Sequence, residues 1–159
     1  MLKILTERSY QNLVDVGCGS GVLALAGLQL GVERAVALDI DPQALKLSRI
    51  NGHLNGLESR LMLVNGSAEA VAGSFDLILA NLPMQVLTEK LPELCRLSRP
   101  GSGLVISGFQ DLDKPLLQEE LRRQGLKEKT WLSADLVFFG DSPTGSFTWM
   151  AVHASREHS

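Results

Sequence analysis

The chain alternates between short apolar runs and longer amphipathic segments, with turn residues between them. This pattern predicts five β-strands, at residues 12–17, 34–40, 60–66, 75–81 and 103–109. A regular succession of strand and helix needs crossover connections, which are typical of a parallel sheet with helices on both faces. We therefore expect an α/β fold built on a mostly parallel sheet.

Caps and turn residues mark the predicted helices. Asp41 followed by Pro42 predicts a helix start, because the first can cap the helix and the second fits its first turn. Two further helices are predicted over residues 86–97, with a stop at 99–101, and over 114–124. The apolar residues of the helix after Asp41 recur on one face, as in an amphipathic helix: Leu47, Ile50 and Leu54.

The pattern changes after Lys127. Two strand-like segments, residues 128–140 and 146–154, are joined by turn residues at 141–145, so the sheet is expected to end in an antiparallel strand pair. No repeat, low-complexity segment or linker divides the chain. Its 159 residues suffice for one compact core, and we expect a single domain over residues 1–159.

Charge and cysteine content exclude several classes of protein. The formal net charge of −3 argues against strong, sequence-independent binding to nucleic acid, which needs clustered Lys and Arg. The two cysteines, Cys18 and Cys95, form no CxxC pair and the three histidines are scattered, so neither a disulfide framework nor a metal site is expected. The longest apolar stretch, residues 22–30, is too short to span a bilayer. We expect no membrane segment and a cytoplasmic location.

A glycine-rich turn, Gly17-Cys18-Gly19-Ser20-Gly21, lies between the first predicted strand and the first helix. In an open parallel sheet, ligands bind beyond the carboxyl ends of the strands and against a helix N-terminus. Glycines there allow positive φ and a close approach of the ligand to the backbone. A tight strand-to-helix turn without a ligand is the alternative interpretation, because a glycine triplet alone is a weak signal.

Two classes of ligand compete for such a turn. A dinucleotide needs Gly-x-Gly-x-x-Gly, but here the third glycine, Gly21, comes one residue too early. Asp15 is unfavourable beside a pyrophosphate and well suited to a ligand's ammonium group. Asp39, at the end of the second strand, can accept hydrogen bonds from two ribose hydroxyls in either class of ligand. The spacing therefore favours a ligand that carries an amine and no phosphate.

The stretches "VDVGCGSGVLALAGLQLG" and "VALDIDPQALKLSRINGHLNG" resemble motifs I and II of the class I S-adenosylmethionine-dependent methyltransferases. The similarity continues through "NGSAEA", "FDLILANLP" and "LSRPGSGLVISGF" and covers residues 2–125. Within that superfamily, the chain is most similar to the catalytic domain of PrmA-type ribosomal protein methyltransferases. The resemblance implies a Rossmann-like sheet of seven strands and S-adenosyl-L-methionine as the cofactor.

The resemblance also implies roles for individual residues around the cofactor. Asp39 would hold the ribose, and Ile40 would lie against the adenine, whose edge would meet Ser67 and Ala68. Many relatives have Asp at the position of Ser67, so a weaker contact to the adenine amine is expected here. The residues that would surround the methionine part of the cofactor are Asp15, Gly17, Cys18, Gly19 and Gly21.

The catalytic corner is expected at Asn81-Leu82-Pro83-Met84, where the fourth strand ends beside the cofactor's methyl group. Methyl transfer from a sulfonium is an in-line displacement, so the enzyme must hold an unprotonated nucleophile close to the methyl carbon. The Asn81 side chain and the next backbone carbonyl can accept hydrogen bonds from an amine. We assign Asn81 and Pro83 to catalysis, and Asn81 also to the cofactor site. The alternative is a strand end capped by Asn and terminated by Pro.

The Asn-Leu-Pro-Met sequence lies between two patterns of the superfamily. Enzymes that methylate nucleobases or glutamine usually have Asn-Pro-Pro-aromatic, whereas PrmA-like proteins have Asn followed by two aliphatic residues. No aromatic residue follows here to stack on a base, so the expected acceptor is an aliphatic amine, such as a lysine side chain or the N-terminus of a protein. A small-molecule methyltransferase and a non-catalytic cofactor-binding module are the alternatives.

PrmA-type enzymes carry an N-terminal domain that docks the ribosomal protein, followed by a Gly-x-His-x-Thr segment that folds over the cofactor. This chain begins at "MLKILTER", within the helix that follows that segment. We therefore expect that a partner supplies substrate docking, that the substrate is smaller, or that this is a shortened chain with reduced activity.

Aromatic residues gather in the last two predicted strands. They are Trp131, Phe138, Phe139, Phe147 and Trp149. Core packing or a homodimer surface is the expected role. A substrate wall over the site is the alternative.

Overall fold

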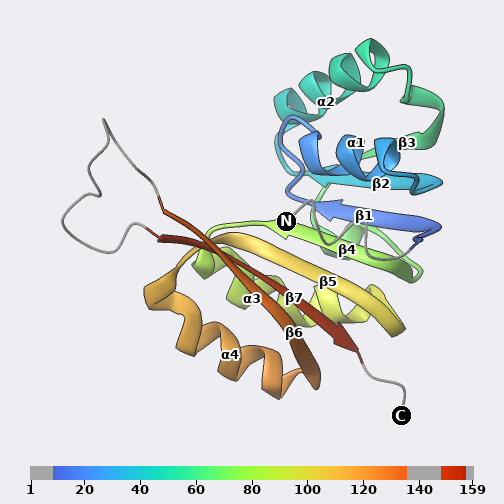
Figure 1. Ribbon diagram of the computed structural model, residues 1–159. Helices are drawn as coiled ribbons and strands as arrows, with labels where there is room; N and C mark the ends of the chain where they lie inside the picture. Colours follow the sequence, from blue (N-terminus) through green and yellow to red (C-terminus); the bar gives the residue numbers. More distant parts are fainter. Residues whose placement is uncertain (1–8, 136–147, 157–159) are drawn as a thin grey trace.

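The computed structural model describes residues 9–135 and 148–156, which form one twisted sheet flanked by helices (Figure 1). The sheet has seven strands in the order β3-β2-β1-β4-β5-β7-β6. The strands are β1 (Asn12–Val16), β2 (Arg34–Asp39), β3 (Leu61–Asn65), β4 (Phe75–Asn81), β5 (Ser98–Gln110), β6 (Leu126–Asp135) and β7 (Thr148–Arg156). The predicted Rossmann-like α/β fold is confirmed.

The directions of the strands agree with the change in the hydrophobic pattern after Lys127. The five strands from β1 to β5 pair in parallel, whereas β7 pairs antiparallel with both β5 and β6. The antiparallel C-terminal pair is thereby confirmed, and the turn predicted at 141–145 lies outside the described residues. Because β1 and β4 lie at the centre, their carboxyl ends meet at the middle of one edge of the sheet.

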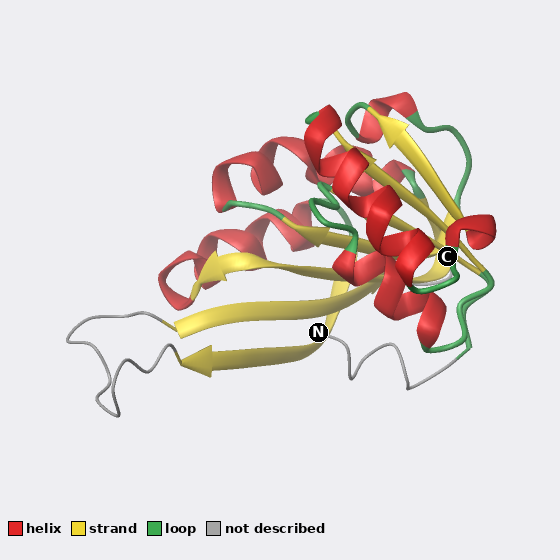
Figure 2. Cartoon of the chain, turned by 90° about the horizontal axis from the view of Figure 1, so that it is seen from above, coloured by secondary structure: helices red, strands yellow, loops and turns green. Residues whose placement is uncertain are grey.

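Two pairs of helices cover the two faces of the sheet (Figure 2). The helices α1 (Val22–Gln29) and α2 (Pro42–Leu54) pack on one face, with a core around Leu13, Leu25 and Leu28. The helices α3 (Met84–Arg96) and α4 (Lys114–Arg123) pack on the other, around Ile78, Leu91 and Leu117. Three short 3₁₀ turns complete the described elements: η2 (Glu58–Arg60), η3 (Ala68–Ala70) and η4 (Asp111–Asp113).

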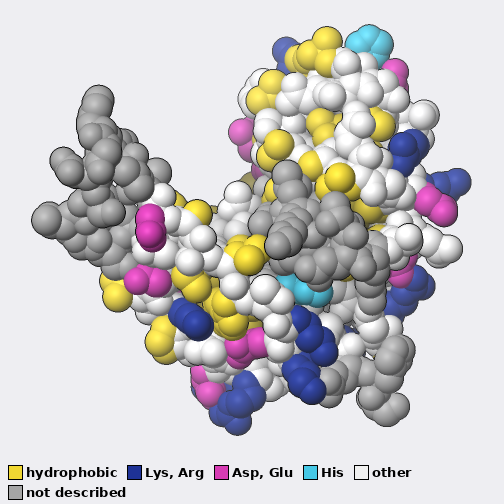
Figure 3. Space-filling view, viewed as in Figure 1, with side chains coloured by type: hydrophobic (Ala, Val, Ile, Leu, Met, Phe, Trp, Pro, Cys, Tyr) yellow, Lys and Arg dark blue, Asp and Glu magenta, His cyan; other side chains and the backbone are white. Residues whose placement is uncertain are grey.

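The helix α2 packs on the sheet through one leucine and two small residues rather than through its apolar stripe. Its buried positions are Leu45, Ser48 and Gly52. The stripe of Leu47, Ile50 and Leu54 is 47%, 47% and 75% exposed. Small side chains permit close approach, since a β-carbon on Gly52 would lie 3.1 Å from the Cδ2 of Leu61. Figure 3 shows hydrophobic side chains on the surface at the α2 end of the molecule.

Strand β5 begins earlier than the sequence predicts. Residues 99–101, predicted as a helix stop, lie inside the strand, where the pairing with β4 shifts register between Phe75 and Leu77. The buried hydroxyl of Ser102 stabilises this irregular start, because it accepts a hydrogen bond from the Arg99 amide at 2.9 Å and donates one to the Phe75 carbonyl at 2.5 Å. A side chain thus replaces part of the regular ladder.

Candidate cofactor and acceptor site

The glycine-rich turn at residues 17–21, called the glycine loop below, follows β1 and is hydrogen-bonded to β2. The amides of Gly17 and Cys18 both donate to the carbonyl of Leu38, each at 2.9 Å. Gly17, Gly19 and Gly21 have φ values of 73°, 54° and 79°, which residues with side chains rarely adopt. The loop therefore needs its glycines, and it ends at the N-terminus of α1.

The helix α2 holds the glycine loop from outside. The Ser48 hydroxyl donates to the Gly19 carbonyl at 2.7 Å, and the Asn51 amide donates to the Ser20 carbonyl at 2.9 Å. A β-carbon on Gly21 would lie 2.8 Å from the Ser48 Oγ, so loop and helix are in close contact. Sequence reasoning missed Ser48 and Asn51. No local signal in the sequence marks Ser48, which the structure places, fully buried, on the face of α2 that packs against the sheet.

Asp15 lies beneath the loop with one oxygen satisfied and one free. It is 1% exposed, and its Oδ2 accepts a hydrogen bond from the Ala24 amide at 3.1 Å. The Oδ1 has no hydrogen-bond partner among the described residues. Burial raises the pKa of this carboxyl from 3.8 to about 7, while the Ala24 amide lowers it and the charge of Asp39 raises it by smaller amounts. An ammonium group would satisfy the free oxygen.

Asp39 and Ile40 follow directly at the end of β2. The Asp39 carboxylate accepts hydrogen bonds from the amides of Gly19 at 2.8 Å and Asp41 at 2.9 Å, so its orientation is fixed across the glycine loop. Ile40 is 76% exposed and offers a bare apolar surface beside it. The carboxylate of Asp41 accepts from the Gln43 amide at 2.9 Å, which confirms its role as a helix cap.

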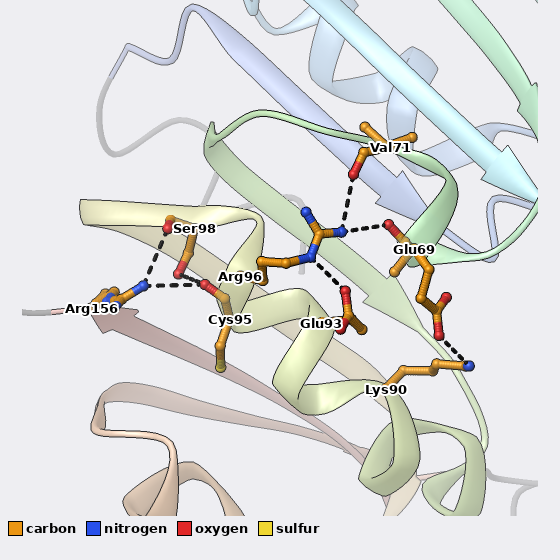
Figure 4. Close-up of polar contacts among 9 residues, drawn as sticks. Glu69, Val71, Lys90, Glu93, Cys95, Arg96, Ser98 and Arg156 are labelled. Carbon is orange, nitrogen blue, oxygen red and sulfur yellow. Dashed lines mark hydrogen bonds and ion pairs between the residues drawn. The ribbon is translucent and has the colours of Figure 1, made fainter.

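Ser67 and Ala68 begin the segment after β3. Ala68 is fully buried and Ser67 is half-buried at the start of η3. Figure 4 shows the guanidinium of Arg96, from the end of α3, reaching this segment. Its Nη2 donates to the carbonyls of Ala68 and Val71, both at 3.0 Å. Sequence reasoning missed Arg96, because its contact joins the end of α3 to the segment between β3 and β4. Such a contact between distant parts of the sequence leaves no local signal.

The catalytic corner lies where β4 ends. Asn81 is exposed, and the following Leu82 amide donates to the Ser107 carbonyl of β5 at 3.0 Å. Pro83 is the N-cap of α3, with φ of −55° and ψ of 146°, so the chain is extended up to the first helical residue. A β-carbon on Gly17 would lie 2.4 Å from the Cδ2 of Leu82. Gly17 of the glycine loop therefore packs directly against Leu82.

A pocket of about 630 Å³ opens beside Asn81. Its walls include Ser107 and Gly108 of β5, Leu132 of β6 and Trp149 of β7. Trp149 is the aromatic residue among these walls and is 45% exposed. Trp131 instead packs edge-on against Phe109 at 6.2 Å between ring centroids. Three predicted members of the aromatic cluster lie outside the described residues: Phe138, Phe139 and Phe147.

Cys18 fills space within the glycine loop. It is 6% exposed, its Sγ lies 3.7 Å from the Ser48 Oγ, and burial raises the pKa of the thiol to about 11. The thiolate that a nucleophile or a metal ligand needs is thus disfavoured. Within residues 9–135 and 148–156, no cluster of His, Cys, Asp and Glu could hold a metal ion, and no helix is long and apolar enough to cross a membrane.

Comparison with known proteins identifies the family. Residues 2–135 match the family described as Ribosomal protein L11 methyltransferase (PrmA). A ribosomal protein L11 methyltransferase of Gloeobacter violaceus is 37% identical over 135 residues, which are 81% of this chain and 43% of that protein. One from Pseudomonas aeruginosa is 44% identical over 103 residues, which are 65% of this chain and 35% of that protein. The chain thus spans less than half the length of these relatives.

Solved structures agree with this relationship. The crystal structure of ribosomal protein L11 methylase from Lactobacillus delbrueckii subsp. bulgaricus superposes with a TM-score of 0.82 and 26% identity, covering 99% of this chain and 77% of that one. Magnesium protoporphyrin IX methyltransferase from Synechocystis, solved with bound S-adenosylmethionine, has a TM-score of 0.78 at 13% identity, over 98% of this chain and 76% of that one, and shows the shared fold. The chain belongs to the PrmA family of ribosomal protein L11 methyltransferases.

Proposed function

We propose that this chain is the catalytic domain of an S-adenosylmethionine-dependent N-methyltransferase whose acceptor is an amine of a protein. The observation that carries the proposal is the position of Asn81, the last residue of β4, whose exposed side chain borders the pocket and whose neighbour Leu82 packs against the glycine loop. The names of the relatives support the same activity and a protein acceptor, and we place the reaction in the cytoplasm, where such acceptors are made.

The residues of the loop and of β2 fit the proposed cofactor. The free Oδ1 of Asp15 can accept a hydrogen bond from the ammonium group of the cofactor. The carboxylate of Asp39 can accept hydrogen bonds from the ribose hydroxyls. Ile40 offers an apolar face to the adenine, and a β-carbon on Gly19 would meet nothing within 4 Å, so there is space for a ligand. Bound there, the cofactor would supply a methyl group on a positively charged sulfur, and the sulfur would leave when the nitrogen of the amine attacks the methyl carbon in line.

The chain's own residues prepare the amine. The described walls of the pocket contain no Asp or Glu, so an ammonium that enters loses hydration without gaining a carboxylate partner. This lowers the pKa of the ammonium and favours the neutral amine. The Asn81 side-chain oxygen and the Leu82 carbonyl can then accept hydrogen bonds from the amine, while Pro83 fixes the backbone between strand and helix. Positioning of this kind contributes on the order of 7 to 11 kcal/mol to catalysis.

The test is methyl transfer from S-adenosylmethionine labelled on its methyl group. The purified chain is incubated with purified ribosomal protein L11 and, separately, with a cell extract that is then divided into protein, nucleic acid and small molecules. Label in protein supports the proposal. The Asn81→Ala variant is expected to lose turnover by about 10²-fold or more while still binding S-adenosylhomocysteine. Asp39→Ala is expected to lose that binding, and Asn55→Ala, a change at the exposed end of α2, serves as the matched control.

Three results would contradict the proposal. Label found only in small molecules would replace the protein acceptor by a metabolite. If the chain binds the cofactor but transfers no labelled methyl group to any fraction, it is a cofactor-binding module and not an enzyme. Normal turnover by Asn81→Ala would show that the catalytic corner is assigned wrongly.

A further inference from the structure

Arg96 makes more contacts than a surface ion pair needs. Its Nε donates to Glu93 at 2.6 Å, while its Nη2 donates to both the Ala68 and Val71 carbonyls at 3.0 Å (Figure 4). These two carbonyls belong to the first residue of η3 and to the residue that follows the turn. A guanidinium is planar and always charged, so it can hold two acceptors in a fixed relation that a flexible ammonium cannot reproduce.

Besides the burial of Ala68 in the core and a hydrogen bond between the side chains of Ser67 and Glu69, few contacts hold the turn. The amide of Val71 reaches the Ala68 carbonyl at a long 3.4 Å, and the Ala70 amide reaches the Ser67 carbonyl at 2.9 Å. A 3₁₀ turn of three residues gains little from its own hydrogen bonds. The ion pair between Lys90 and Glu69 at 2.8 Å lies at the surface, where such pairs stabilise weakly. Arg96 therefore provides the strongest described polar anchor of this segment.

We propose that Arg96 is a positioning residue for the adenine side of the cofactor site. Through the carbonyls of Ala68 and Val71 it fixes the turn that presents Ser67 and Ala68 to the edge of the adenine. The inference rests on the proposed function, since it assumes an adenine-containing cofactor. It adds that recognition of the base depends on a residue at the far end of α3, which does not touch the ligand.

The test measures discrimination between two bases. Dissociation constants of S-adenosylhomocysteine and of S-inosylhomocysteine, in which an oxygen replaces the adenine amine, are determined by calorimetry. In the wild type, the adenine form is expected to bind more tightly. Arg96→Met is expected to weaken binding of the adenine form about five- to tenfold, as for the loss of one charge-assisted contact. Binding of the inosine form should change little, so the ratio of the two constants falls towards one.

Two further variants serve as controls. Arg96→Lys keeps a cation and is expected to restore part of the discrimination. Arg122→Met removes a comparable pair, since Arg122 lies 2.7 Å from Glu119 three residues earlier on α4, but it touches no part of the site. It should leave both constants unchanged. A loss of folding alone reduces the number of binding sites and leaves the ratio of the two constants as it was, so the ratio separates positioning from stability.

The outcomes distinguish the two proposals. If Arg96→Met keeps the wild-type ratio, or if the wild type itself binds both ligands equally, the positioning role is wrong while the cofactor assignment stands. If the wild type binds neither ligand, the proposed function fails, and this inference fails with it.

Discussion

A β-carbon on Gly108 would lie 2.6 Å from the side-chain oxygen of Asn81 and 2.7 Å from the carbonyl oxygen of Leu82. Gly108 also has φ of +95°, which a side chain rarely tolerates. The carboxyl end of β5 thus approaches the catalytic corner so closely that only glycine fits. The position of Asn81 is set by the neighbouring strand as well as by its own.

Replacement of Gly108 by Ala is therefore expected to displace Asn81 and to lower kcat for methyl transfer by about 10²-fold, the typical cost of a 1 Å displacement of a reacting group. Binding of S-adenosylhomocysteine should change less than kcat, because the atoms nearest to the new methyl belong to Asn81 and Leu82 and not to the glycine loop. Steady-state kinetics and calorimetry measure the two effects. Gly125→Ala is the matched control, since Gly125 also has positive φ, 68°, but a β-carbon there meets nothing within 4 Å. An unchanged kcat for Gly108→Ala would refute the steric argument.

Asp15 predicts a pH dependence of stability. Its pKa is raised by burial to about 7 in the folded protein, against 3.8 for the free side chain, so the folded state binds the proton more tightly. The stabilisation is complete below pH 3.8 and is lost as the pH rises through about 7. The full effect corresponds to roughly 4 kcal/mol of unfolding free energy. Asp15→Asn is neutral throughout, so its stability relative to the wild type should increase from pH 4 to pH 7.

Urea unfolding of both proteins, without ligand, at several pH values measures this difference. A constant difference across the range would show that Asp15 is not protonated in the folded protein. S-adenosylhomocysteine brings an ammonium that favours the ionised carboxylate, so its affinity for the wild type should rise with pH up to about 7. Asp15→Asn should bind weakly at every pH.

The hold of α2 on the glycine loop gives a third prediction. Ser48→Ala and Asn51→Ala each remove one hydrogen bond to a loop carbonyl, at Gly19 and Ser20. A hydrogen bond of this kind contributes about 1 kcal/mol, so each change should weaken S-adenosylhomocysteine binding by about fivefold. Asn55→Ala is the control, because its amide donates to the Asn51 carbonyl within the helix and not to the loop. Equal affinity in all three variants would show that the loop keeps its shape without these bonds.

Much of this architecture could be predicted from local pattern. Strand periodicity, the Asp41 cap and the glycines are signals within a few residues of one another, and they place β1, α2 and the loop correctly. The place of Asn81 at the end of β4 was predicted in the same way. These predictions succeed because hydrogen bonds and burial within one element are dictated by its own sequence.

The supports of the site could not be predicted in this way. Ser48, Arg96 and Gly108 come from three different elements, and each acts on residues at least 25 positions away. The partner of such a residue is determined by tertiary packing, which no local pattern encodes. The early start of β5 has the same origin, since the buried Ser102 hydroxyl donates a hydrogen bond to the carbonyl of Phe75 on the neighbouring strand β4.

The last prediction concerns α2, whose apolar stripe of Leu47, Ile50 and Leu54 faces solvent. Leu45 is 8% exposed and Leu47 is 47% exposed, although the two residues are chemically identical and two positions apart. Leu45→Ala should lower the free energy of unfolding by about 2 to 5 kcal/mol, because it leaves a cavity beneath the helix. Leu47→Ala should change it by less than about 0.5 kcal/mol, because the side chain is half in water already.

Urea unfolding at two protein concentrations distinguishes the outcomes. A small effect of Leu47→Ala at both concentrations agrees with a stripe that faces solvent. An effect as large as that of Leu45→Ala would mean that the stripe is covered in solution. If that effect also grew with concentration, the cover would be a second copy of the chain, since only association makes unfolding depend on concentration.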